Sequence, residues 1–113
     1  MTRAPLPDGH VSMVDIARDA DLARALARQD PTGPRATAVR ARLRRYILLV
    51  IDEAEAYGRG LPDDRRRDIV LHDIDLARQA AALQPGEADP VVALRMLAES
   101  ARRTTAYTRG NTQ

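Results

Sequence analysis

Apolar residues recur every three or four positions along most of this chain, which is the spacing of one face of an α-helix. The pattern predicts four helices, at about residues 12–29, 35–57, 62–84 and 89–110. Prolines and glycines interrupt the pattern between them. No stretch alternates like a strand, and we expect no internal repeat. The sequence therefore predicts an all-α, four-helix single domain over residues 1–113, with an irregular N-terminal arm at 1–10 and a tail at 110–113.

Polar residues stand where three of these helices should begin. Ser12 with Asp15 resembles a capping box, in which side chains satisfy the first free backbone N–H groups. Asp63 follows a proline at the start of the third helix, where a carboxylate suits the helix dipole. Asp89 followed by Pro90 is a typical cap and first-position pair. These signals fix the starts of the helices more sharply than periodicity does.

The second predicted helix carries six consecutive apolar residues, Tyr46 to Ile51, with arginines before them and carboxylates after them. A helix that is apolar all round its middle must be covered on several sides. The chain has no Phe and no Trp, so its own aliphatic core is modest. We therefore expect a second copy to supply part of the cover, in an intertwined or tightly packed homodimer.

Composition excludes several kinds of chemistry. All 18 basic residues are arginines and there is no cysteine, which rules out a Schiff-base lysine, a thiolate nucleophile, a disulfide and a thiolate metal site. The net charge of +2 does not by itself indicate nucleic acid. No apolar run approaches the ~18 residues of a membrane span. We expect a cytoplasmic protein with no cofactor, no metal, no nucleic-acid partner and no membrane partner.

Two groups are candidate proton carriers. His72 lies between Asp68 and Asp75 on a predicted helix, where a paired imidazole can act as a general acid or base. The structural alternative is a boundary histidine hydrogen-bonded to Asp68, and a metal site has less support because a second nitrogen or sulfur ligand is missing. Glu53 follows the apolar run, which can raise the pKa of a carboxyl group. The alternative for Glu53 is an ordinary solvated helix face.

Arginines and tyrosines provide candidate binding groups. Arg44 and Arg45 belong to the cluster at residues 40–45, and a second cluster occupies 65–67. Arginine forks bind carboxylates and phosphates, but neither cluster is interleaved with aromatic residues for base stacking. The favoured explanation for the clusters is intramolecular salt bridges. Binding of a peptide carboxylate is second and binding of DNA is third. Tyr46 and Tyr107 are interpreted as core or interface residues first, and as walls of a ligand groove second.

Several segments together resemble a known family. They are the run Leu43–Ala56, the Leu61-Pro62 turn, His72–Arg78, the Gln84–Gly86 break and Leu97–Arg102. This arrangement is similar to small actinobacterial proteins of natural-product biosynthesis, and among them to the lysinoalanine-forming enzyme of the duramycin and cinnamycin lanthipeptide pathways. The chain departs from the common pattern at Tyr46 and His72. The resemblance rests on packing patterns and contains no catalytic signature.

The resemblance implies that a substrate lysine amine adds to a dehydroalanine of the same modified precursor peptide. Holding the peptide in a near-attack shape can contribute ~7–11 kcal/mol without an enzyme nucleophile. The expected base is Glu53, His72 or an acidic residue of the substrate. We expect peptide contacts from a groove between subunits, made by Arg44, Arg45, Tyr46, Asp52 and Tyr107. The alternatives are a non-catalytic binding or regulatory protein and, third, a small DNA-binding dimer.

Overall fold

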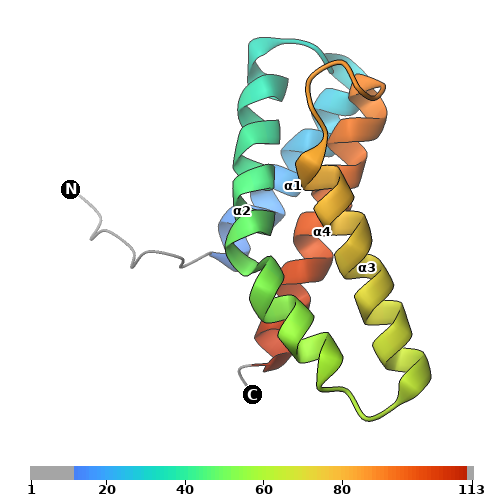
Figure 1. Ribbon diagram of the computed structural model, residues 1–113. Coiled ribbons are helices and arrows are strands. Elements are labelled where there is room, and N and C mark those ends of the chain that lie inside the picture. Colours follow the sequence, from blue (N-terminus) through green and yellow to red (C-terminus); the bar gives the residue numbers. More distant parts are fainter. Residues whose placement is uncertain (1–11, 112–113) are drawn as a thin grey trace, which may run out of the picture.

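Four helices make up the fold in this computed structural model, which describes residues 12–111 (Figure 1). They are α1 (Met13–Gln29), α2 (Pro34–Arg59), α3 (Asp64–Ala82) and α4 (Pro90–Asn111). Within the described residues there is no strand, which confirms the all-α, four-helix prediction. The bounds differ slightly: α2 continues through Gly58, α3 ends two residues before Gln84, and α4 passes Gly110. The predicted N-terminal arm at 1–10 and the end of the predicted tail lie outside the described residues.

The caps predicted at Ser12 and Asp89 are present, and Asp63, which was expected to act through the helix dipole, is also a cap. Ser12 Oγ accepts a hydrogen bond from the backbone N–H of Asp15 at 3.3 Å, and the Asp63 side chain accepts one from Arg66 N–H at 3.1 Å. Asp89 Oδ1 accepts from Val91 N–H at 2.8 Å. Each bond satisfies a backbone donor that the helix itself leaves without a partner. The starts of these three helices are therefore set by local sequence.

The helices form a flattened bundle measuring 43 × 39 × 19 Å along its principal axes. Successive helices run in opposite directions, as Figure 1 shows. Helices α2 and α4 contact each other and both remaining helices, whereas α1 and α3 do not touch. Because α2 and α4 are the central pair, they carry most of the larger buried side chains.

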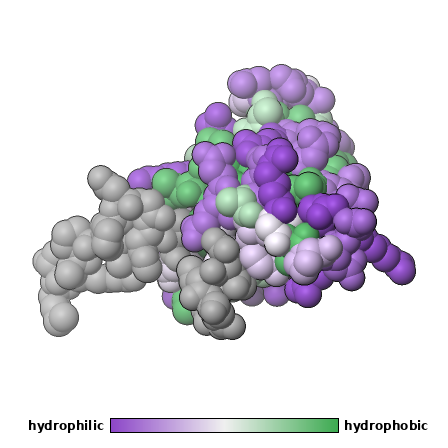
Figure 2. Space-filling model, turned by 60° about the horizontal axis from the view of Figure 1, so that its bottom comes forward, coloured by the Kyte–Doolittle hydropathy of each residue, from purple (hydrophilic) through white to green (hydrophobic). Residues whose placement is uncertain are grey.

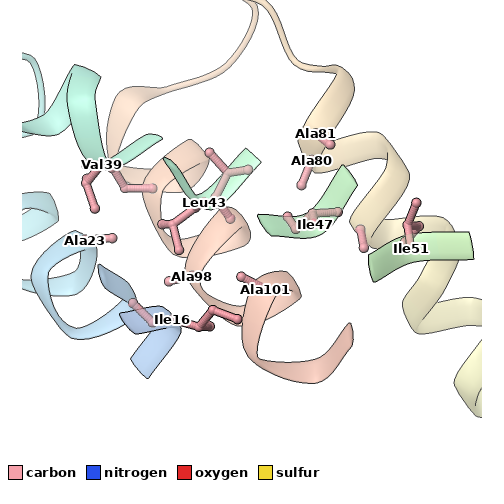
Figure 3. Close-up of a cluster of buried hydrophobic side chains, with 14 of the residues drawn as sticks. Ile16, Ala23, Val39, Leu43, Ile47, Ile51, Ala80, Ala81, Ala98 and Ala101 are labelled. Atoms are coloured by element: carbon pink, nitrogen blue, oxygen red, sulfur yellow. The ribbon is translucent and has the colours of Figure 1, made fainter. Parts of the chain in front are cut away.

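In the part of the core around α2, large residues of this helix face small residues of the other helices. Val39, Leu43 and Ile47 are fully enclosed, and Figure 3 shows them pointing into the space between the helices. The alanines that meet them there come from α1, α3 and α4 (Ala23, Ala80, Ala81, Ala98, Ala101). Alanine allows helix backbones to approach closely, so few large side chains suffice to fill the interior.

The apolar run of α2 is covered on one side only. Ile47, Val50 and Ile51 are buried, but Leu48 remains 52% exposed and Leu49 41% exposed. The reason is geometric: α1, α3 and α4 all pack on the same half of α2, and no described element covers its outer half. Where it is not grey, the face shown in Figure 2 is mostly hydrophilic, with hydrophobic residues among the polar ones. No helix among residues 12–111 has both the length and the apolar character needed to cross a membrane.

Candidate functional site

The two candidate proton carriers lie apart on the surface of the protein. Glu53 is exposed on α2 and His72 is exposed on α3. Neither side chain makes a hydrogen bond or ion pair with another described residue, so the alternative bond between His72 and Asp68 is not formed. Asp52 is also exposed, with one oxygen 3.3 Å from an Arg78 nitrogen. The structure does not gather these three residues into a shared cavity.

Two of the predicted contact residues line cavities. Tyr46 lies with Asp15, Arg18, Asp19 and Arg42 at one of about 370 Å³, and Arg44 lines another. This cavity, of about 360 Å³, lies between α2, the end of α3 and α4, and we call it the arginine cavity (Thr37, Arg40, Ala41, Arg44, Ala80, Leu83, Gln84, Pro85, Leu97). Arg44 Nε donates to the backbone oxygen of Ala81 at 2.7 Å, which fixes the guanidinium at the wall. Arg40 lies one helical turn earlier on the same wall. Two guanidinium groups so placed suit a carboxylate or another small anion.

Tyr46 belongs to a polar contact between α1 and α2. Its hydroxyl donates to Asp19 Oδ2 at 2.8 Å, and Arg42 donates to both Asp19 oxygens at 2.9 Å. Asp19 is 6% exposed. Burial opposes ionisation of Asp19, but hydrogen bonds from Arg42 and Tyr46 outweigh it and hold the carboxyl pKa below its usual value. Burial, followed by the bond to Asp19, raises the pKa of Tyr46 to about 12.

Tyr107 belongs to a matching contact between α3 and α4. Its hydroxyl donates to Asp73 Oδ2, and Arg103 Nη1 donates to Asp73 Oδ1 at 3.2 Å. Burial and then the bond to Asp73 raise the pKa of Tyr107 to about 12. The Tyr107 ring stacks on Tyr57, with centroids 6.1 Å apart and planes 17° from parallel. Tyr46 and Tyr107 therefore direct their hydroxyls to aspartates on neighbouring helices.

The two aspartates of these contacts belong to a repeated hexapeptide that apolar spacing does not reveal. Asp19 begins the hexapeptide Asp-Ala-Asp-Leu-Ala-Arg at 19–24, and Asp73 begins Asp-Ile-Asp-Leu-Ala-Arg at 73–78. In each helical hairpin the aspartate meets an arginine and a tyrosine four residues further along the next helix. The expectation of no internal repeat was wrong, because periodicity registers only apolar positions. The repeated hexapeptide was the signal that could have found both aspartates.

Some arginines of the two clusters form ion pairs within the described residues. Arg42 pairs with Asp19 and Arg67 pairs with Asp64, as the salt-bridge interpretation predicts. Arg45, in contrast, is exposed and forms no ion pair with another described residue. Across residues 12–111 no three His, Asp or Glu side chains are grouped so that they could hold a metal ion.

Comparison with known proteins gives one match. Residues 3–108 match a family model described as a family of unknown function, DUF6415. No curated protein and no solved structure matches the chain.

Proposed function

We propose a peptide-tailoring function for this chain, which belongs to the DUF6415 family of unknown function. In this proposal the protein binds a dehydrated, thioether-bridged precursor peptide and templates closure of a lysinoalanine cross-link. The reaction class comes from the family resemblance described above. The arginine cavity is the observation that supports peptide binding.

The arginine cavity is suited to an acidic group of a peptide. Arg40 and Arg44 provide charge, while Thr37 and Gln84 add neutral hydrogen-bonding groups beside the apolar Leu83 and Leu97. Because Arg44 is already anchored to Ala81, little side-chain entropy is lost when a carboxylate binds. The proposed contact is therefore a peptide carboxylate held by the two arginines.

The proposed chemistry needs little from the enzyme beyond position. The lysine nitrogen forms a bond to the β-carbon of dehydroalanine, the amine loses a proton, and the α-carbon gains one, so the mass is unchanged. None of the side chains that line the arginine cavity is a carboxylate or a histidine. We therefore propose that an acidic residue of the substrate accepts the amine proton. Glu53 and His72 remain the alternative bases.

The absence of a base from the cavity wall also favours the second candidate function. A helical protein that binds a peptide or a biosynthetic enzyme without catalysing a reaction needs the same arginines and no proton carrier. Under either function we propose that the protein acts as a homodimer.

An assay on a precursor containing both dehydroalanine and lysine separates the two functions. Ring closure is detected by loss of thiol capture at dehydroalanine and by suppressed fragmentation across the new ring. Closure by the wild-type protein supports the enzymatic proposal. Undiminished thiol capture with intact peptide binding refutes it and supports the binding protein.

Substitution of the two arginines tests whether the peptide binds at the arginine cavity. Arg44→Gln and Arg40→Gln should each weaken peptide binding about tenfold or more, because charge-assisted hydrogen bonds contribute about 1.5–3 kcal/mol. Arg28→Gln, an exposed arginine on α1, is the matched control and should bind like wild type. Equal binding by all three variants would eliminate the arginine cavity as the site. Loss of turnover in Glu53→Gln or His72→Gln with intact binding would assign the base to the protein.

A further inference from the structure

The outer half of α2 is an exposed surface on which apolar, charged and small residues follow a regular order along the helix. We give the name outer α2 face to seven exposed residues in the central part of this side of the helix (Ala38, Ala41, Arg45, Leu48, Leu49, Asp52, Ala56). They recur at three- and four-residue intervals, which places them along one side of a helix. The two leucines lie at its centre, flanked by charge and then by alanine. Ala41 also lines the arginine cavity and Asp52 contacts Arg78 of α3, but Leu48 and Leu49 at the centre of this face are left exposed by the other described helices.

The outer α2 face is complementary in charge to a second copy of itself that runs in the opposite direction. The midpoint between Leu48 and Leu49 is also the midpoint between Arg45 and Asp52, and between Ala41 and Ala56. Opposite charges thus stand at equal distances from the centre, about 5 Å along the axis at 1.5 Å per residue. Small residues stand at equal distances further out. Reversal of the helix therefore brings each charge opposite one of the other sign.

We infer that a second copy of this chain docks on the outer α2 face, with the two α2 helices antiparallel and a twofold axis between Leu48 and Leu49. In this arrangement the four leucines of the two copies cluster around the axis. Arg45 of each copy meets Asp52 of the other, and Ala41 meets Ala56, where the absence of bulk allows close approach. An isologous pair of this kind is the commonest oligomer symmetry of soluble proteins.

The charges favour a second copy over other occupants. Arg45 has no ion-pair partner among the described residues, and the Asp52 side chain is 93% exposed despite its contact with Arg78. Parallel docking would place Arg45 against Arg45 and Asp52 against Asp52, which is repulsive, whereas antiparallel docking pairs them. The exposed Leu48 and Leu49 supply the apolar centre that such an interface needs. The inference deepens the homodimer part of the proposed function and does not depend on the peptide chemistry.

A charge exchange tests both the partner and the register. The association state is measured by analytical ultracentrifugation over a range of concentrations. The wild type should dimerise, and Arg45→Asp or Asp52→Arg alone should raise the dimer dissociation constant at least about tenfold, because each creates two like-charge contacts. The double variant R45D/D52R restores opposite charges and should return to within about threefold of wild type. A double variant as weak as the single variants would overturn the register.

A second pair of variants tests the apolar centre with a matched control. Leu48→Glu buries a charge in the proposed interface and should yield a monomer. Val92→Glu introduces the same charge at a similarly exposed residue of α4 and should leave the dimer intact. Circular dichroism verifies that both variants remain helical. A wild-type monomer at every concentration, or a dimer insensitive to Leu48→Glu, would overturn the inference. Failure of ring closure with the dimer unaffected would refute only the proposed reaction.

Discussion

Asp19 and Asp73 are carboxylates enclosed between helices, with side chains only 9% and 11% exposed. An enclosed charge is strongly unfavourable unless it is paired and hydrogen-bonded. Each aspartate obtains one arginine and one tyrosine from the next helix along the chain. These contacts join α1 to α2 and α3 to α4.

Tyr46→Phe tests the energetic importance of one such contact. Removing the hydroxyl leaves Asp19 with one donor fewer, and we expect a loss of about 1.5–3 kcal/mol in the free energy of unfolding, the usual range for a hydrogen bond to a charged group. Tyr57→Phe is the control, because the Tyr57 hydroxyl makes only an exposed, 3.4 Å contact with Arg66; its change should stay within about 0.5 kcal/mol. Urea unfolding measures both variants. Equal effects would show that the Asp19 contact has no special importance.

Ionisation of two tyrosines predicts how the free energy of unfolding changes at alkaline pH. The pKa of Tyr46 and of Tyr107 is raised from 10.0 to about 12 in the folded protein. A group whose pKa is higher folded than unfolded stabilises the fold fully below its unfolded pKa, and this contribution is lost as pH rises through the folded pKa. The free energy of unfolding should therefore fall between about pH 10 and pH 12. The double variant Y46F/Y107F should show a shallower fall over this range, and an identical slope would contradict the assignment.

At the scale of the elements, α2 and α3 pack closely against each other at Gly58. A Cβ placed on Gly58 would stand 2.8 Å from Val70 Cγ1 and 3.2 Å from Leu71 Cδ2. Valine is stiff about its side-chain torsion and cannot move aside easily. Gly58, which follows the helix predicted at 35–57, is therefore a residue inside α2 that permits close packing of α3.

Gly58→Ala and Gly60→Ala form a matched pair for this contact. Alanine favours a helix over glycine by about 1 kcal/mol, but overpacking at Gly58 costs about 1–3 kcal/mol, so we expect net destabilisation of Gly58→Ala. Gly60 has a right-handed φ of −82°, and a Cβ there meets no atom closer than 3.5 Å. Gly60→Ala should be neutral or slightly stabilising in thermal unfolding. A stabilised Gly58→Ala variant would show that α3 shifts readily away from α2.

At the scale of the whole molecule, α2 supplies more of the large buried side chains than any other helix of the thin bundle. Ile47 is fully buried, while Ile69 on α3 is 54% exposed. Ile47→Ala should cost about 2–5 kcal/mol because it removes buried surface and leaves a cavity, whereas Ile69→Ala should cost far less. Chemical denaturation of the two variants compares them directly. Similar losses would mean that Ile69 is also covered in solution.

Local sequence determined the elements of this protein. The helices and their starts follow from apolar spacing and from the caps at Ser12, Asp63 and Asp89, because these signals act within one or two turns of the chain. The prediction that the apolar run of α2 would not be fully covered by its own chain also follows from sequence. Residues 46–51 surround the helix, and Leu48 and Leu49 indeed remain exposed. Their cover by a second copy stays a prediction.

The tertiary structure alone decided which polar residues meet. Arg44 reaches the end of α3 at Ala81, 37 positions along the chain, and Tyr46 reaches Asp19, 27 positions away. No periodicity within one helix carries that information, because such contacts depend on how the helices pack. For the same reason, residue type alone made Glu53 and His72 candidate proton carriers, although they are exposed residues of different helices. The sequence by itself determined which helices form and which faces are apolar, whereas only their packing determined the arginine cavity and the two enclosed aspartates.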